Sequence, residues 1–351
     1  MARALASLAQ ALLRRALPEE RLLFACLHQS FDDPARARVA ACATQVQAWD
    51  AVLRIAVRHQ VAPLVLHALG AADVLERVAD AVRASLHHEM LRNVAAKAVM
   101  RSKLIAVLNE FAAEGLDVMA VKGTSLDLRL RDPALTVSGD IDLLVRQDWA
   151  QTSAAMHARV AALNAGTPVV DIDCARHPDL VMNGVLPVDF AGIWAQATRA
   201  PIGDAPLFRM RVEHDLLCAC INSARKRFFR LKSLFELAEL LRTHPDLDWN
   251  LVVRDAHAWR CSAIAFVALT ATAATTGAPI PVDLAKRFVL SRVRVRALES
   301  LIARMSFSRL ATLHTGVRLR GKSVGRALML VYASLGRGAA RAAWCSLRRT
   351  P

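Results

Sequence analysis

Two aspartates one residue apart stand inside an apolar stretch, and they are the residues of this chain best suited to chemistry. Asp140 and Asp142 flank Ile141 and precede a Leu-Leu-Val run. Residues two apart in a β-strand project from the same face, so the two carboxylates lie side by side while Ile141 turns to the opposite face. Neighbouring carboxylates repel each other unless a cation lies between them. Mg²⁺ suits this position, because it prefers hard oxygen ligands together with nucleotide phosphates.

A glycine turn upstream of the aspartates supplies the other half of such a site. Lys122, Gly123, Thr124 and Ser125 follow a short apolar run that favours a strand. A glycine between a strand and a helix lets the backbone approach a phosphate, and the helix N-terminus offers unpaired N–H groups. Thr124 and Ser125 add hydroxyl donors, and Lys122 either reaches a phosphate or caps the strand end. The GxxxxGK[ST] pattern of a P-loop is absent. The turn and the aspartates together predict a site for a triphosphate and a metal ion.

Short strands and helices alternate around these motifs. We expect strands at residues 116–122, 141–145, 169–174 and 181–190, and helices at 124–131 and 149–163. The chain before and after this part has helical periodicity, so the predicted fold class is α+β, a small mixed sheet between two helical regions. We expect an N-terminal helical region, the α/β core, a C-terminal helical region and a basic helical tail, with boundaries at 1–110, 111–205, 206–282 and 283–351.

The glycine turn followed by an Asp-x-Asp strand resembles the nucleotidyltransferase superfamily that includes DNA polymerase β. The chain is more closely similar to the bacterial family labelled uncharacterised nucleotidyltransferase, through Lys122-Gly-Thr-Ser-Leu126, Gly139-Asp-Ile-Asp-Leu-Leu-Val145 and Val188-Asp-Phe190. The similarity covers about residues 20–270. It implies transfer of a nucleoside monophosphate from an NTP, with ATP as the expected donor, to a hydroxyl of a small molecule, sugar, peptide or protein.

The resemblance also implies roles for individual residues. Asp140, Asp142 and Asp189 would hold Mg²⁺, with a two-metal site expected, and Asp189 would also serve as a base toward the acceptor hydroxyl. The turn at 122–125 would bind the nucleotide phosphates. Asp171 and Asp173 repeat the Asp-x-Asp pattern without a glycine turn at suitable spacing, so we do not expect them to be the metal pair. Either one stays an alternative to Asp189 as the third carboxylate.

The sequence departs from the family pattern at three places. Residues 135–138 lack the arginine that often precedes the Asp-x-Asp strand, Phe190 stands where a histidine is expected, and Ser223 stands where a later helix often carries one. An arginine can neutralise a transferring phosphate, so its loss weakens the case for full activity. The alternative hypothesis is a degenerate nucleotide-binding or interaction protein that uses its basic C-terminal helices.

The net charge of +15 is concentrated toward one end of the chain. Residues 286–351 contain fifteen Lys and Arg but one acid, Glu299. These helices are either solvated faces or a contact for an anionic partner such as nucleic acid, a membrane surface or an acidic protein. We expect no transmembrane segment, because no apolar run reaches the roughly 18 residues of a membrane span. We expect no signal peptide, because the N-terminus lacks a continuous apolar core region and a convincing cleavage site. We expect a cytoplasmic location, since the scattered cysteines form no CxxC and are typical of reduced thiols.

Overall fold

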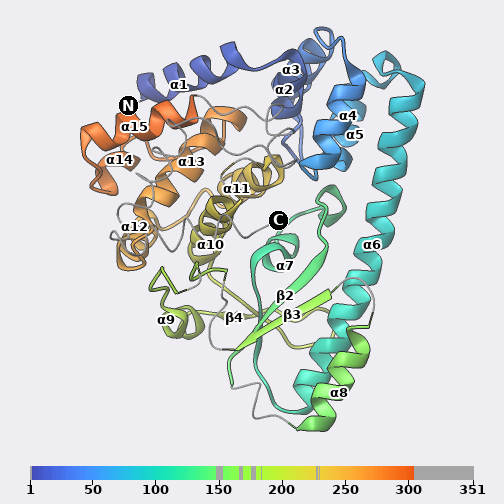
Figure 1. Ribbon diagram of the computed structural model, residues 1–351, viewed down its shortest axis with the longest axis vertical. Coiled ribbons are helices and arrows are strands. Elements are labelled where there is room, and N and C mark those ends of the chain that lie inside the picture. Colours follow the sequence, from blue (N-terminus) through green and yellow to red (C-terminus); the bar gives the residue numbers. More distant parts are fainter. Residues whose placement is uncertain are drawn as a thin grey trace, which may run out of the picture.

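The structure is a computed structural model that describes residues 2–147, 153–165, 169–174, 179–182, 184–226, 228 and 230–303. A group of helices forms one half of the molecule and a small sheet forms the other, and α6 runs along one side of both (Figure 1). The fold is α+β, as predicted. No helix of the described part is long and apolar enough to cross a membrane.

The N-terminal part of the chain is helical, as its periodicity indicates. Its helices are α1 (Ala2–Arg15), α2 (Pro18–Ala25), α3 (Asp33–Ala43), α4 (Trp49–Arg58), α5 (Ala62–Ala71), η1 (Leu75–Arg77) and α6 (Asp80–Ala113). Local signals set several of the helix starts. The Asp32 carboxylate caps α3 by accepting from the Ala35 N–H at 2.8 Å, and Pro63 lies in the first turn of α5, where its missing donor costs little.

The sheet has the strand order β3-β2-β1-β5-β4. Its strands are β1 (Val118–Ala120), β2 (Asp140–Val145), β3 (Val169–Cys174), β4 (Thr198–Arg199) and β5 (Phe208–Arg209). The sheet is mixed, because β2 runs antiparallel to β1 but parallel to β3. The register places Asp142 opposite Asp171 of β3.

The two faces of β2 are buried in different hydrophobic cores. Ile141, Leu143 and Val145 belong to a core that includes residues of α6 and of α8 (Ala154–Leu163). Leu144 belongs to the larger core that includes the helical half of the molecule. The alternation expected for residues 140–145 is therefore confirmed. Asp142 lies on the face of β2 that is turned toward the helical half of the molecule, and not on the face that packs against α6.

The remaining helices cover the second face of the sheet and build the helical half. They are α7 (Lys122–Asp127), η2 (Pro133–Leu135), α9 (Phe190–Ala195), α10 (Val212–Arg225), α11 (Leu231–Thr243), α12 (Trp249–Ala258), α13 (Ser262–Thr276), α14 (Leu284–Arg287) and α15 (Arg292–Ile302). Helix α7 lies between the sheet and α10 (Figure 1). Helix α13 is almost wholly buried, and it ends at Gly277, whose φ of 70° is the left-handed conformation that favours glycine.

One predicted strand is wrong. The described residues of 181–190 form turns, and the chain enters α9 at Phe190. The apolar side chains of Leu180, Val181 and Leu186 are buried in the helical core, so their apolar character reflects packing and not sheet pairing. Helix α8 begins at Ala154, and residues 149–152 of the predicted 149–163 helix lie outside the described part. The domain boundaries remain predictions, and the basic tail from residue 304 onward is likewise outside the described residues.

Candidate functional site

The turn after β1 is fixed against the carboxylate strand by backbone hydrogen bonds. The Val121 N–H donates to the Asp142 carbonyl at 3.1 Å, and the Asp142 N–H donates to Oγ1 of Thr124 at 2.8 Å. Lys122, not Gly123, adopts the left-handed conformation, with a φ of 50°. Helix α7 begins at Lys122, two residues before the predicted start at 124, so Gly123 lies in its first turn.

Lys122 joins two carboxylates at the end of this turn. Its Nζ donates to Oδ1 of Asp142 at 2.6 Å and to Oδ2 of Asp179 at 2.9 Å. Burial lowers the pKa of the Lys122 ammonium, but the carboxylates of Asp142 and Asp179 outweigh burial and raise it overall. Burial, and then the charge of Asp142, raise the pKa of Asp140, which is the exposed member of the pair. A position that favours positive charge therefore lies beside these carboxylates.

A cavity of about 220 Å³ opens between this turn and the junction of α10 and α11. The sheet side of its wall contributes Lys122, Gly123, Asp140, Asp142 and Asp179. The helical side contributes four cations together with polar groups, namely Arg225, Lys226, Arg230, Lys232, Gln60, Asn222, Ser233 and Glu236. Acidic groups from the sheet thus face basic groups from the helices across one hollow.

The basic side chains are held partly by the protein and partly by one another. Arg225 forms an ion pair with Asp179 at 2.5 Å, and Arg230 donates to the side chain of Gln60 at 3.2 Å. Burial, followed by the nearby charge of Lys232, lowers the pKa of Lys226. Cations gathered in this way are partly desolvated and repel each other, and a bound anion relieves both effects.

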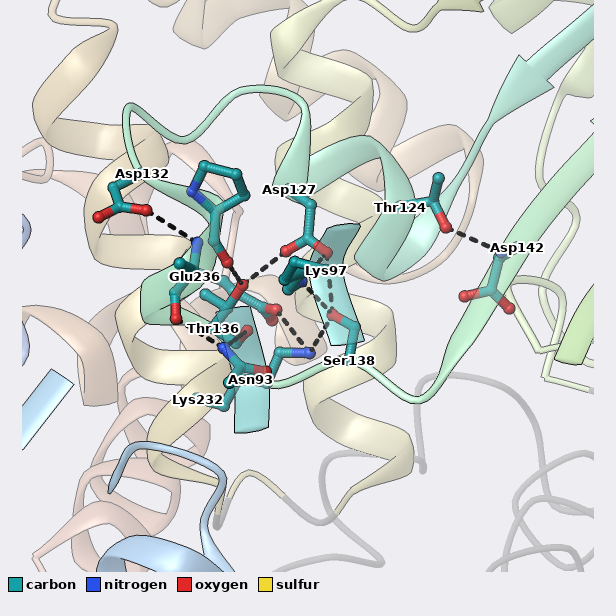
Figure 2. Close-up of polar contacts among 12 residues, drawn as sticks. Asn93, Lys97, Thr124, Asp127, Asp132, Thr136, Ser138, Asp142, Lys232 and Glu236 are labelled. Carbon is teal, nitrogen blue, oxygen red and sulfur yellow. Dashed lines mark hydrogen bonds and ion pairs between the residues drawn. The ribbon is translucent and has the colours of Figure 1, made fainter. Parts of the chain in front are cut away.

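A polar network positions the segment that leads into β2 (Figure 2). Asp127 of α7 pairs with Lys97 of α6 and accepts from the hydroxyls of Thr136 at 2.6 Å and Ser138 at 2.9 Å. Nζ of Lys232 on α11 donates to Oγ of Ser138 at 3.3 Å. Helices α6, α7 and α11 therefore jointly fix the approach to Asp140.

The comparisons with known proteins give one match. A family described as "Uncharacterised nucleotidyltransferase" matches residues 45–277, which is most of the chain. The chain belongs to this family. Membership indicates nucleotidyl transfer in general and implies an NTP substrate. No curated protein and no solved structure matches the chain significantly.

The residues expected to bind the nucleotide in this nucleotidyltransferase are only partly brought together. Lys122 and Gly123 line the cavity. Thr124 is buried, and its hydroxyl accepts the Asp142 N–H. Ser125 is fully buried, and its hydroxyl donates to the carboxylate of Asp215 at 2.8 Å, away from the cavity. Of the four turn residues that the sequence predicts to bind phosphates, only Lys122 and Gly123 therefore face the cavity.

The three expected carboxylates are likewise separated. Asp140 and Asp142 line the cavity, but Asp189 does not. Asp189 is exposed and caps α9, where its Oδ1 accepts from the Gly192 N–H at 2.9 Å. Asp179 takes the place beside Lys122 instead. The side chains of the repeated Asp-x-Asp in β3 lie outside the described part.

Sequence reasoning missed Asp179 and the cations of the helical region. No local pattern marks Asp179. The run that includes Arg225, Lys226, Arg230 and Lys232 was a usable signal, because basic residues crowd the junction of two otherwise apolar helices.

The donor atoms of the site decide whether it can hold Mg²⁺. Among the described residues, no three side chains of the His, Cys, Asp and Glu types converge as a metal-binding group. Mg²⁺ is usually held by one or two carboxylates together with water and substrate phosphates, so Asp140 and Asp142 are a sufficient donor set. The ammonium of Lys122 between Asp142 and Asp179 marks a place where a cation is favoured. The residues therefore fit an Mg²⁺ ion that takes its remaining ligands from substrate phosphates and water.

Proposed function

We propose that this cavity transfers a nucleoside monophosphate from an Mg²⁺-bound NTP to a hydroxyl acceptor. The observation that carries the proposal is a pair of carboxylates on β2 that faces four cations across one cavity. All of these residues lie inside the part of the chain that the nucleotidyltransferase family matches. ATP is the expected donor, and the acceptor is a small molecule, sugar, peptide or protein.

The phosphates bind on the cationic side of the cavity. A triphosphate carries several negative charges, and charge-assisted hydrogen bonds from Lys and Arg are among the strongest in proteins. Arg225, Lys226, Arg230 and Lys232 supply these donors. Gly123 lets a phosphate approach the backbone, because the space beside it is open: a β-carbon there would have Oγ of Ser138, at 4.0 Å, as its nearest neighbour. No protein atom would clash with a β-carbon at position 123. We therefore attribute the glycine to the need for room for a ligand in the cavity.

Asp140 and Asp142 would hold Mg²⁺. When bound, the metal ion neutralises charge on the reacting phosphates and orients them toward the attacking oxygen. Lys122 holds Asp142 and Asp179 close to each other. We assign the role of third carboxylate to Asp179 instead of Asp189, because Asp179 lines the cavity. This role includes accepting the proton of the acceptor hydroxyl.

The surroundings of Ser138 argue against the alternative that the protein is degenerate and inactive. The family often carries an arginine before the Asp-x-Asp strand, and this chain has Ser138 in that segment. Lys232 reaches Ser138 from α11 and also lines the cavity. A positive charge is therefore available beside the missing arginine, which favours an active enzyme over a binding module.

The experiment is incubation of the protein with each α-labelled NTP, Mg²⁺ and a cell extract, followed by detection of the labelled product and of pyrophosphate. Gly123→Ala is the most informative variant, because it fits the fold and alanine is favoured over glycine in a helix by about 1 kcal/mol. We expect retained thermal stability with at least about a tenfold loss in kcat/KM for the NTP, equivalent to about 1.4 kcal/mol. The matched control is Gly70→Ala, which changes another helical glycine remote from the cavity. Unchanged kinetics of Gly123→Ala would exclude this cavity as the NTP site.

A pair of aspartate variants separates the two assignments of the third carboxylate. We expect Asp179→Asn to abolish transfer and Asp189→Asn to preserve it, because asparagine also caps a helix. The reverse outcome would return the role to Asp189. Asp246→Asn, in the exposed turn before α12, controls for the loss of one negative charge.

A further inference from the structure

A second, larger cavity lies on the other side of α7. Its volume is about 550 Å³, within the range typical of small-molecule sites. It is bounded by α6, by the end of α7 and η2, and by the segment at 201–203. Its walls are largely apolar, with Val94, Ala98, Leu104, Leu128, Ile141 and Ile202 among the lining residues.

Arg209 of β5 brings an unsatisfied positive charge into this apolar cavity. Its Nε is buried and has no hydrogen-bond partner among the residues that the structure describes. Burial, followed by the nearby charge of Arg129, lowers the pKa of Arg209. The neighbouring acid, Asp215, is already bound by Nε of Arg129 at 2.6 Å and by the hydroxyl of Ser125. Arg209 as a whole is half-buried, and its buried Nε lacks the hydrogen bond that would offset desolvation, so the geometry favours an external anion.

The acidic residues of the wall already have partners within the protein. Asp127 pairs with Lys97, and the Asp132 carboxylate accepts from the Ala134 N–H at 2.9 Å. Arg101 is an exposed second cation of the wall. The cavity therefore combines an apolar interior with a positive charge that lacks a counter-ion.

We propose that this cavity binds a small amphiphilic carboxylate, with its apolar chain against α6 and Ile141 and its carboxylate on Arg209. An Arg–carboxylate pair in a largely apolar cavity is strong and geometrically specific. The ligand does not compete for the NTP site, because Ile141 projects from the face of β2 opposite to Asp142. It contacts β2 and helix α7, the two elements that also carry the proposed NTP site. The binding itself does not depend on the proposed nucleotidyl transfer.

The test is calorimetric titration of the full chain with sodium octanoate and, separately, with octan-1-ol. The two probes share an apolar chain and differ in charge. We expect octanoate to bind at least about tenfold more tightly than octan-1-ol. Arg209→Met should lose that difference, while the control Arg199→Met, which removes an arginine of the adjacent strand β4 outside the cavity wall, should keep it. Circular dichroism checks that each variant is folded.

A cavity-filling variant gives a second readout in case Arg209→Met fails to fold. Ala98 is exposed on α6 and lines the cavity, so Ala98→Phe places a ring in the mouth without removing any buried group. We expect it to weaken both probes by at least about tenfold. Equal binding of octanoate and octan-1-ol, undiminished octanoate binding by Ala98→Phe, or no octanoate binding at millimolar concentration overturns the proposal.

Discussion

Replacing Lys122 by methionine tests whether the carboxylates of the site need a cation. The Lys122 side chain is 9 % exposed and its partner Asp142 is 2 % exposed, so the ion pair is buried. Removing one partner of a buried pair typically costs about 3–5 kcal/mol, because the other charge stays desolvated. Asp179 keeps its ion pair with Arg225, and methionine preserves most of the packing. We therefore expect the free energy of unfolding to fall by about 3 kcal/mol, the lower end of that range.

Mg²⁺ should restore much of this loss. A ligand that binds only the folded state at a hundred times its Kd stabilises it by about 2.7 kcal/mol. In the native protein the ammonium of Lys122 competes with Mg²⁺ for Asp142, so Mg²⁺ should stabilise the Lys122→Met variant more than the unchanged protein. The measurement is urea unfolding followed by circular dichroism, in EDTA and in MgCl₂.

The control and the refuting results are equally specific. Lys286→Met removes an exposed lysine on α14 and should change neither stability nor the response to Mg²⁺. Equal stability of Lys122→Met and the unchanged protein in EDTA would refute the role of the buried pair. Equal stabilisation of both proteins by Mg²⁺ would refute the competition between Lys122 and the metal ion.

Three further substitutions test other parts of the fold. Arg129→Met removes the 2.6 Å partner of buried Asp215 and should lower the free energy of unfolding in urea by about 3–5 kcal/mol; a loss below about 1 kcal/mol would contradict this. Gly277→Ala should lower it by about 1 kcal/mol, because the φ of 70° disfavours alanine although nothing crowds a β-carbon there; an unchanged melting temperature would argue against such strain. Burial, and then the charge of Arg242, lower the pKa of His28 to about 4, below its ordinary value near 6.5. The fold is therefore favoured above pH 6.5, where His28 is neutral, and this contribution is lost as the pH falls toward 4. His28→Gln should reduce the difference in urea stability between these pH values by about 2 kcal/mol after screening. A pH profile identical to that of the unchanged protein would exclude this contribution of His28.

The carboxylate strand was predictable because its pattern is local. A period of two places Asp140 and Asp142 on one face whatever surrounds the strand, and the structure buries Ile141 on the other. The glycine turn was found for the same reason, since its signal spans a few adjacent residues. The helical regions were predictable from apolar periodicity, because this pattern is set by the helix itself and does not depend on which elements pack against it.

The rest of the site depends on contacts between distant residues. Ser125 looks like a phosphate donor by position, but its hydroxyl is taken by Asp215, which lies 90 residues later in the chain. The basic residues at the junction of α10 and α11 were visible in the sequence, but only the packing of the helices against α7 aims them at Asp140. The apolar run near Val181 led to a wrong strand prediction. Burial in a helical core and pairing in a sheet select the same residue types, so the sequence does not distinguish them.

The origin of the cavity walls in two separate stretches of the chain has a consequence for biosynthesis. The carboxylate wall is complete once Asp179 has left the ribosome, whereas Lys232 on the opposite wall is 53 residues further along. At about 5–20 residues per second, the acidic half exists for roughly 3–10 s before its basic counterpart is made. During that interval the nascent chain cannot form the basic wall, so the nucleotide affinity that we propose for this cavity would arise only late in translation.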